Sequence, residues 1–167
     1  MTFIKNTLAS IVLCFVFTGG ALAQSKGDVK PIDFGPMEKL TIITDTGAQT
    51  FDVEIADTLE EQARGMMYRE EVPLETGMLF EFERPKIATI WMKNTGVSLD
   101  ILFIRGNGKI LKIEHSATPY TLRSASSEAP VAAVLELASG RSLDLGIKPG
   151  DLVSHEFFGT ENAVKAN

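Results

Sequence analysis

The sequence predicts a mainly β fold: a compact β-sandwich or barrel-like domain with one amphipathic helix and one short helix. Three observations lead to this prediction. Apolar and polar residues alternate over many short stretches, turn signals rich in Gly and Asn separate those stretches, and only two stretches carry a helical pattern. Many short strands with few helices are typical of a sheet that closes on itself or packs on a second sheet.

The first two predicted strands, Lys39–Thr44 and Gln49–Ile55, form a hairpin. The residues between them include Asp45-Thr46-Gly47, and glycine adopts the positive φ that tight hairpin turns require. From Phe51 onward every second residue of the second strand is apolar, so we expect one face of that strand to be buried.

An amphipathic helix follows the hairpin. Thr58 and Glu61 stand three residues apart, the spacing of a capping box at a helix N-terminus. Apolar residues then recur at helical spacing and predict a stripe that packs on the core. The stripe consists of Leu59, Ala63, Met66 and Met67.

Four apolar stretches in the middle of the chain are predicted strands. They are Gly77–Phe82, Ile87–Lys93, Leu99–Ile104 and Lys109–His115. We expect the second and third to be joined and paired through the turn at residues 94–96. The third and fourth should pair across residues 105–108, where two glycines and an asparagine favour a turn.

The remaining elements are a strand over Val131–Ala138, a short helix near Arg141–Leu145 that ends at Gly146, and a strand over Leu152–Phe157. Alternation along these strands predicts which side chains form the core. The expected core residues are Met78, Phe80, Ile90, Met92, Ile101, Phe103 and Leu135.

The N-terminus predicts export. Lys5 precedes an apolar run from Leu8 to Phe17, and an Ala-x-Ala pattern then ends at Ala23. This arrangement is typical of a signal peptide over residues 1–23, cleaved between Ala23 and Gln24. The run is too short for a spanning helix, which needs about 20 apolar residues. We therefore expect a periplasmic or secreted protein with no membrane anchor after cleavage.

The chain after the signal peptide is expected to fold as a single domain over residues 38–158, with a flexible leader at 24–37 and a flexible tail at 159–167. Cys14 is the only cysteine and lies within the signal peptide, so the mature chain is cysteine-free. The formal net charge is −6. That charge argues against nucleic acid and anionic membrane surfaces as partners.

The region from Phe51 to Val153 resembles the domain-of-unknown-function 192 family. Five segments carry the resemblance, in the order and spacing of the family: ARGMMYRE (63–70), GMLFEF (77–82), IWMKNTGVSLDILFI (90–104), VLELASG (134–140) and LGIKPGDLV (145–153). The resemblance implies a compact β-rich domain, often exported in bacteria. It implies no established reaction, substrate or cofactor.

Trp91, Lys93, Asn94 and Asp100 form the most distinctive group of polar and aromatic residues. If the strands pair through the turn at residues 94–96, these side chains lie near one end of the sheet. A ring, a cation, an amide and a carboxylate could together bind a polar ligand such as a saccharide. In the alternative, Asp100 accepts hydrogen bonds from turn amides, Lys93 pairs with it, and Trp91 covers the rim of the core.

Arg64 and Glu136 are further candidates. Arg64 stands four residues after Glu60, as in an ordinary helical ion pair, but it could also hold an anion in a cleft between helix and sheet. Glu136 interrupts an apolar strand, so its carboxylate needs a partner if it is buried. Glu136 and Asp100 could also form the carboxylate pair of a glycoside hydrolase.

Other catalytic and metal-binding patterns are absent from the sequence. His115 and His155 each stand alone, without the further ligands of a zinc site, so we expect no metal or cofactor. The preferred function is a non-catalytic periplasmic module that binds a small polar ligand or envelope component, such as a saccharide or small anion. The alternatives are a hydrolase or lyase using Asp100, Glu136 and Lys93, and a structural or partner-binding envelope protein.

Overall fold

The computed structural model describes residues 30–163 of the chain. Contacts divide the chain into two units, Met1–Pro31 and Ile32–Asn167, and the helices and strands of the described residues belong to the second. The predicted signal peptide and its cleavage site between Ala23 and Gln24 lie outside the described residues.

Strands dominate the second unit, with two short α-helices and one 3-10 helix among the described residues. In chain order the elements are β1 Glu38–Thr44, β2 Gly47–Ala56, α1 Leu59–Arg64, β3 Thr76–Ile90, β4 Leu99–Ile104, β5 Ile110–Ala117, β6 Ala125–Ala138, α2 Arg141–Asp144, β7 Leu152–Ser154 and the 3-10 helix Glu156–Phe158. Within residues 30–163 no helix has the length and apolar character needed to cross a membrane.

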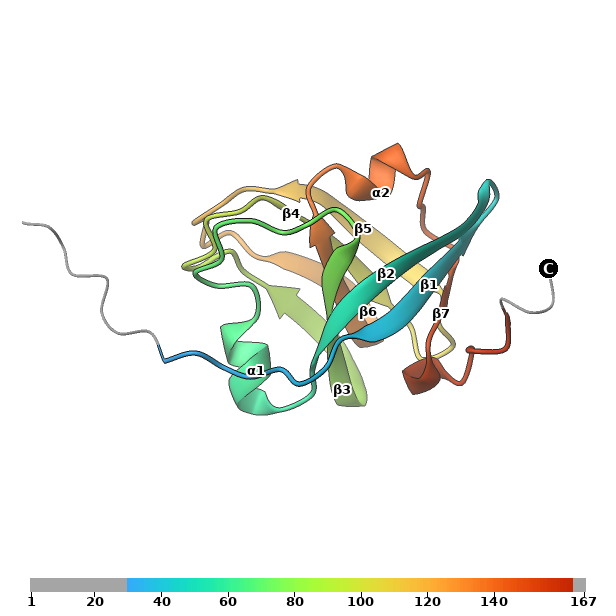
Figure 1. The fold of residues 1–167 in the computed structure, drawn as a ribbon, viewed down its shortest axis with the longest axis horizontal. Helices are drawn as coiled ribbons and strands as arrows, with labels where there is room; N and C mark the ends of the chain where they lie inside the picture. The colour runs from blue at the N-terminus through green and yellow to red at the C-terminus, as the bar shows by residue number, and fades with distance from the viewer. Residues whose placement is uncertain (1–29, 164–167) are drawn as a thin grey trace, which may run out of the picture. The chain divides into compact units, whose positions relative to one another are not determined.

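The seven strands form one curled sheet in the order β5-β4-β6-β3-β2-β1-β7 (Figure 1). Strands β2 and β3 are parallel, and the other neighbouring pairs are antiparallel. The edges of the sheet approach each other where Lys109 forms a bridge with Leu152 and the Val153 amide donates to the Gly108 carbonyl at 2.8 Å. The mainly β, barrel-like prediction is therefore confirmed.

Two apolar clusters occupy the two faces of the sheet. The inner cluster draws residues from all seven strands: Leu40, Ile42, Phe51, Val53, Leu79, Leu102, Ile104, Ile110, Ala133, Leu135, Leu137, Ile147 and Val153. The outer cluster comprises Ala56, Met66, Met78, Phe80, Phe82, Ala88, Met92, Leu99, Ile101, Phe103, Ala117, Val131 and Val134. Of the expected core residues, only Ile90 is not fully buried.

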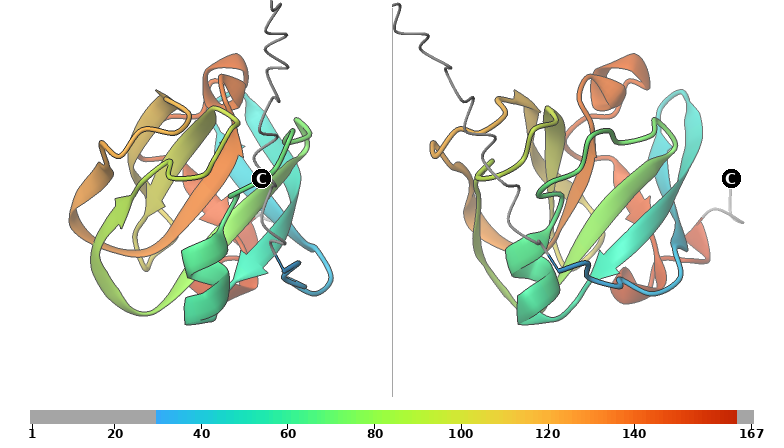
Figure 2. Two further views of the ribbon diagram at one scale, coloured as in Figure 1. Left: turned by 90° about the vertical axis from the view of Figure 1, so that its left-hand side faces the viewer. Right: turned by 60° about the vertical axis from the view of Figure 1, so that its left-hand side comes forward.

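Strands β3 and β6 are the longest, with 15 and 14 residues, and they run together through a bend (Figure 2). The predicted strands Gly77–Phe82 and Ile87–Lys93 are mostly parts of this one strand, with a register shift between Glu81 and Lys86. Because β2 pairs with β3 only as far as Phe80, the second half of β3 is paired with β6 alone.

The predicted pairing through the turn at residues 94–96 is wrong. Strand β4 pairs with β5 and β6, not with β3. After β3 the chain instead bonds to the loop before β6: the Met92 amide donates to the Thr121 carbonyl at 3.2 Å, and the Tyr120 amide to the Thr95 carbonyl at 3.1 Å. These long-range bonds replace the hairpin that the local turn signal favoured.

Helix α1 begins with the predicted capping box, since the Glu61 amide donates to Thr58 Oγ1 at 3.2 Å and the Thr58 amide to Glu61 Oε2 at 2.9 Å. The helix ends at Gly65, which has a φ of 48° and lies against Phe80, where an added Cβ would be 3.0 Å from the ring. The predicted stripe is buried only in part. Met66, just beyond the helix, is 3% exposed and belongs to the outer cluster, whereas Leu59 is 87% exposed and no residue of α1 itself is buried.

The C-terminal elements largely confirm the predictions. The short helix is present as α2. The last strand is shorter than expected because His155 accepts a hydrogen bond from the Phe157 amide at 3.3 Å and begins the 3-10 helix. In all views α1 and α2 lie at opposite ends of the sheet (Figures 1 and 2).

Candidate functional site

The structure divides the predicted site residues between two places. Arg64, Trp91 and Glu136 line one hollow together, and Asn94 is bonded to the segment that follows α1. Asp100 lies instead beneath α2. The expected cluster of Trp91 with Asp100 does not form, because the hairpin that would have joined their strands does not form.

Two adjoining hollows lie between α1 and the second half of β3, and together they are called the α1–β3 groove below. The inner hollow has a volume of about 80 Å³ and contains Glu136 and Trp91. The outer hollow has a volume of about 400 Å³ and extends toward Lys86. The two hollows share five lining residues: Gln62, Ala63, Phe80, Thr89 and Ile90.

Hydrogen bonds hold α1 in place beside the sheet. Gln62 Nε2 donates to the Glu81 carbonyl at 2.7 Å and to the Ala56 carbonyl at 3.3 Å. Beyond the helix, the Tyr68 amide donates to the Asn94 carbonyl at 2.9 Å, and Asn94 Nδ2 donates to the Tyr68 hydroxyl at 2.9 Å. These contacts join the helix to β2 and β3, and join the segment after the helix to the loop that follows β3.

Glu136 lies in the wall of the inner hollow. It pairs in register with Met78 on one side and Ile101 on the other, and it is 4% exposed. Among residues 30–163 its carboxyl group forms no hydrogen bond. Burial raises the pKa of Glu136 to about 8, opposed only by the positive charge of Arg69, which is itself paired with Glu54. At neutral pH Glu136 is therefore protonated, with a donor and an acceptor available to a ligand.

Trp91 and Arg64 line the inner hollow, and Lys93 lies beside the Trp91 ring. Trp91 is 53% exposed, and Lys93 Nζ lies 5.4 Å from the centroid of its ring. Arg64 is half-buried, with its guanidinium carbon 5.6 Å from the centroid of the Tyr68 ring. The inner hollow thus combines an accessible aromatic surface, positive charge and a buried neutral carboxyl group.

Asp100 is fully buried and fully hydrogen-bonded. Its oxygens accept hydrogen bonds from the amides of Ser116 at 2.9 Å, Gly140 at 3.1 Å and Ser142 at 2.9 Å, and from the Ser142 hydroxyl at 2.6 Å. Burial alone would raise its pKa, but these bonds outweigh burial and hold the pKa below the usual range. Asp100 therefore caps α2 from a neighbouring strand. This agrees with the alternative in which Asp100 accepts hydrogen bonds from backbone amides, except that Lys93 is not its partner.

Asp100 and Glu136 lie on adjacent strands but face opposite sides of the sheet. Asp100 is opposite Leu137 in the register, and Ile101 is opposite Glu136. Because successive side chains of a strand alternate between faces, Asp100 points toward the inner cluster and Glu136 toward the outer one. The two carboxyl groups cannot flank one glycosidic bond, so the predicted carboxylate pair is wrong.

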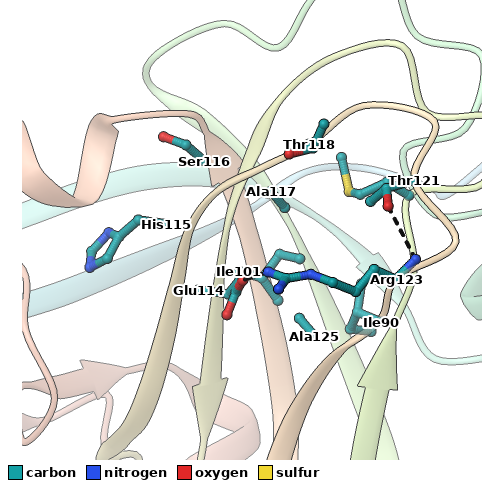
Figure 3. A pocket seen from close by; sticks show the side chains of 11 residues that line it. Ile90, Ile101, Glu114, His115, Ser116, Ala117, Thr118, Thr121, Arg123 and Ala125 are labelled. Carbon is teal, nitrogen blue, oxygen red and sulfur yellow. Dashed lines mark hydrogen bonds and ion pairs between the residues drawn. The ribbon is translucent and has the colours of Figure 1, made fainter.

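Another hollow, of about 160 Å³, lies beside β5 and the loop before β6 (Figure 3). Its charged groups pair with each other: Arg123 Nη2 lies 3.3 Å from Glu114 Oε1, and the Arg123 amide donates to Thr121 Oγ1 at 3.1 Å. His115 Nδ1 is bonded to Ser142 Oγ at 2.9 Å. Because these groups already have partners, the α1–β3 groove is the better candidate site.

The described part of the chain contains no group of three or more His, Cys, Asp or Glu side chains that could hold a metal ion.

The predicted site residues left out the outer hollow, including Phe82 and Lys86, whose Nζ lies 3.9 Å from the Phe82 ring centroid. Pro85 lies within β3, in the interval where the register with β6 shifts, because proline disfavours regular pairing in a sheet. The apolar residues of α1 were the signal that could have indicated the outer hollow, because an apolar helix face is expected to lie opposite another apolar surface.

Comparison with known proteins gives a family and two similar structures. The DUF192 family model, described as "Uncharacterized ACR", matches residues 41–155. A crystal structure of a protein from Sinorhizobium meliloti 1021, described as a candidate transcription regulator, is 34% identical with a TM-score of 0.73, covering 77% of this chain and 99% of that one. A protein of unknown function from Novosphingobium aromaticivorans is 39% identical with a TM-score of 0.70, covering 71% and 85%. No curated protein matches the chain.

Proposed function

The chain belongs to the DUF192 family, which is described as uncharacterized, and from this premise we propose that its domain binds a small polar ligand in the α1–β3 groove without transforming it. One observation carries the proposal. Glu136 is buried, forms no hydrogen bond within residues 30–163, and lines a hollow beside the exposed ring of Trp91. Among the described residues no fully enclosed side-chain polar atom lacks a hydrogen-bond partner, so the Glu136 oxygens open into the hollow, where a ligand could bond to them.

A saccharide matches these groups best. The flat apolar face of a sugar stacks on an aromatic ring, and its hydroxyl groups both donate and accept hydrogen bonds. The protonated Glu136 carboxyl complements such hydroxyls, since it also donates one bond and accepts others. The charge of Lys93 next to the ring favours a sugar that carries an acidic group.

Binding without catalysis is the function favoured by the composition of the inner hollow. Glu136 is the only side chain with a carboxyl group among its described lining residues, which include no histidine, cysteine or serine. Acid–base or nucleophilic catalysis requires a second group within hydrogen-bond reach of the first. The signal-peptide pattern that ends at Ala23 supports a place of action in the periplasm or outside the cell.

A thermal-shift screen of saccharides, including uronic acids, tests the proposal. A ligand that binds only the folded protein raises the melting temperature by mass action. We expect hits with the parent protein that weaken at least tenfold in Trp91→Ala and in Glu136→Gln. The matched control is Tyr120→Ala, which removes another exposed aromatic side chain outside the groove. Hits that survive both groove substitutions, or no hits at all, would contradict the proposal.

A further inference from the structure

We propose that the ligand is an amphiphilic saccharide, with its sugar in the inner hollow and an alkyl or acyl chain along the outer hollow. The inference rests on the proposed function of the inner hollow and adds a second subsite to it. It explains why an apolar surface continues outward from the polar site.

Apolar side chains line both sides of the outer hollow, together with Gln62, Lys86 and Thr89. Leu59 and Ala63 of α1 form one side, and Phe82, Ile87 and Ala88 of β3 form the other. Leu59 is 87% exposed and Ile87 is 58% exposed, so the groove has large apolar side chains facing solvent on both sides. Apolar surface of this kind gains free energy when a ligand covers it.

The sequence pattern of α1 leads to the same conclusion. Of the apolar stripe that begins in the helix, Met66 is buried in the outer cluster, whereas Leu59 and Ala63 line the groove. The strand opposite is open on this side, because β2 stops pairing with β3 at Phe80. Within the described residues, no element covers the space between them.

The two hollows are continuous, which favours one ligand that spans both. They share five lining residues, among them Phe80 and Ile90. The main polar side chain between them, Gln62, is already bonded to the carbonyls of Glu81 and Ala56. A chain lying in the outer hollow therefore meets apolar contacts and displaces few hydrogen bonds, whereas a sugar would leave its hydroxyl groups without partners there.

A series of alkyl β-glucosides from methyl to octyl tests the proposal, with each compound kept below its micelle concentration. Calorimetric titration of the whole mature protein should show affinity rising up to roughly fourfold per added methylene, as expected for burial of each group. The gain should level off once the chain is longer than the groove. The double variant Leu59→Ser/Ile87→Ser should lose this chain-length dependence and still bind methyl glucoside.

The control is Leu122→Ser, which replaces an exposed apolar side chain outside the groove. This substitution should leave the dependence of affinity on chain length unchanged. The proposal is overturned if affinity is independent of chain length, if the double variant keeps the dependence, or if no glucoside binds. It is also overturned if the parent is a dimer in sedimentation that the double variant dissociates, since the groove would then be a contact between copies.

The test separates this inference from the proposed function. If methyl and octyl glucosides bind equally and both are lost in Trp91→Ala, only the apolar subsite is wrong. If octyl glucoside binds through Leu59 and Ile87 while Trp91→Ala has no effect on any member, the sugar-binding role of the inner hollow is wrong.

Discussion

The carboxyl groups of Asp100 and Glu136 are both buried on adjacent strands, but their surroundings differ completely. Asp100 lies beneath α2 with four hydrogen bonds from protein donors, and its pKa is lowered. Glu136 lies near α1 with no hydrogen bond in the described part of the chain, and its pKa is raised to about 8. Burial is common to both, so hydrogen bonding is what distinguishes the two ends of the sheet.

The difference separates a scaffold from a candidate site. The Asp100 carboxylate stabilises the fold because it satisfies donors that would otherwise be buried without partners. The Glu136 carboxyl forms no hydrogen bond within the described residues, so it has the unused hydrogen-bonding capacity that the proposed site requires. The following substitutions test this contrast in order of expected effect.

Asp100→Ala should have the largest effect, a loss of roughly 3–5 kcal/mol in the free energy of unfolding, because it leaves three amides and a hydroxyl without their acceptor. Urea denaturation of the purified variant measures this loss. The control is Asp52→Ala, which removes a partly exposed carboxylate paired with Lys39 at 2.8 Å and should cost less than about 1 kcal/mol. Equal losses in the two variants would show that Asp100 is not the cap of α2.

Glu136→Gln should change the free energy of unfolding in the opposite direction to Asp100→Ala, and the size of this change should depend on pH. The folded state holds the Glu136 proton more tightly than the unfolded state does, so the parent loses stability as pH rises from about 4.5 to about 8. The substitution should therefore stabilise the protein by roughly 2–4 kcal/mol at pH 9 relative to its effect at pH 4.

Melting curves of the parent and Glu136→Gln across this pH range measure the difference. Glu81, whose pKa is raised to about 7 by burial and by Glu38 and Asp57, adds its own pH dependence in both proteins. That contribution cancels in the comparison. A stability difference that stays constant from pH 4 to pH 9 would mean that folding leaves the pKa of Glu136 near its usual value of 4.5.

Trp91→Ala and Lys93→Ala should have the smallest effects on stability. Trp91 is half exposed, so its loss should cost less than about 1 kcal/mol, and Lys93→Ala should cost less than about 0.5 kcal/mol. Combined with Asp100→Ala, Lys93→Ala should be additive within about 0.5 kcal/mol, because the residues have no common partner. A larger coupling energy in a double-mutant cycle would mean that Lys93 and Asp100 interact, which contradicts their separation in the structure.

The sequence predicted most of the elements because local signals determine them. Alternation defined β2, a continuous apolar stretch defined β4, and the spacing of Thr58 and Glu61 defined the start of α1. Strand pairing depends on long-range contacts, and no local signal showed that the chain after Met92 bonds to the loop at Thr121.

The error in pairing explains the error in the site. The predicted hairpin placed Asp100 beside Trp91, whereas the observed register places Glu136 between Met78 and Ile101. The sequence did identify Arg64, Trp91 and Glu136 as candidates, but only the three-dimensional arrangement shows that they line one hollow. Hydrogen-bond satisfaction, which separates Asp100 from Glu136, cannot be read from residue types.

A titration of the side-chain carboxyl carbons by NMR tests the central claim most directly, because it reports Asp100 and Glu136 in one sample. We predict that Glu136 titrates near pH 8 and Asp100 below its usual pKa of 3.8. Addition of a saccharide from the screen should change the Glu136 titration and leave Asp100 unchanged. A Glu136 pKa near 4.5 that no ligand alters would contradict the assignment of the α1–β3 groove as the site.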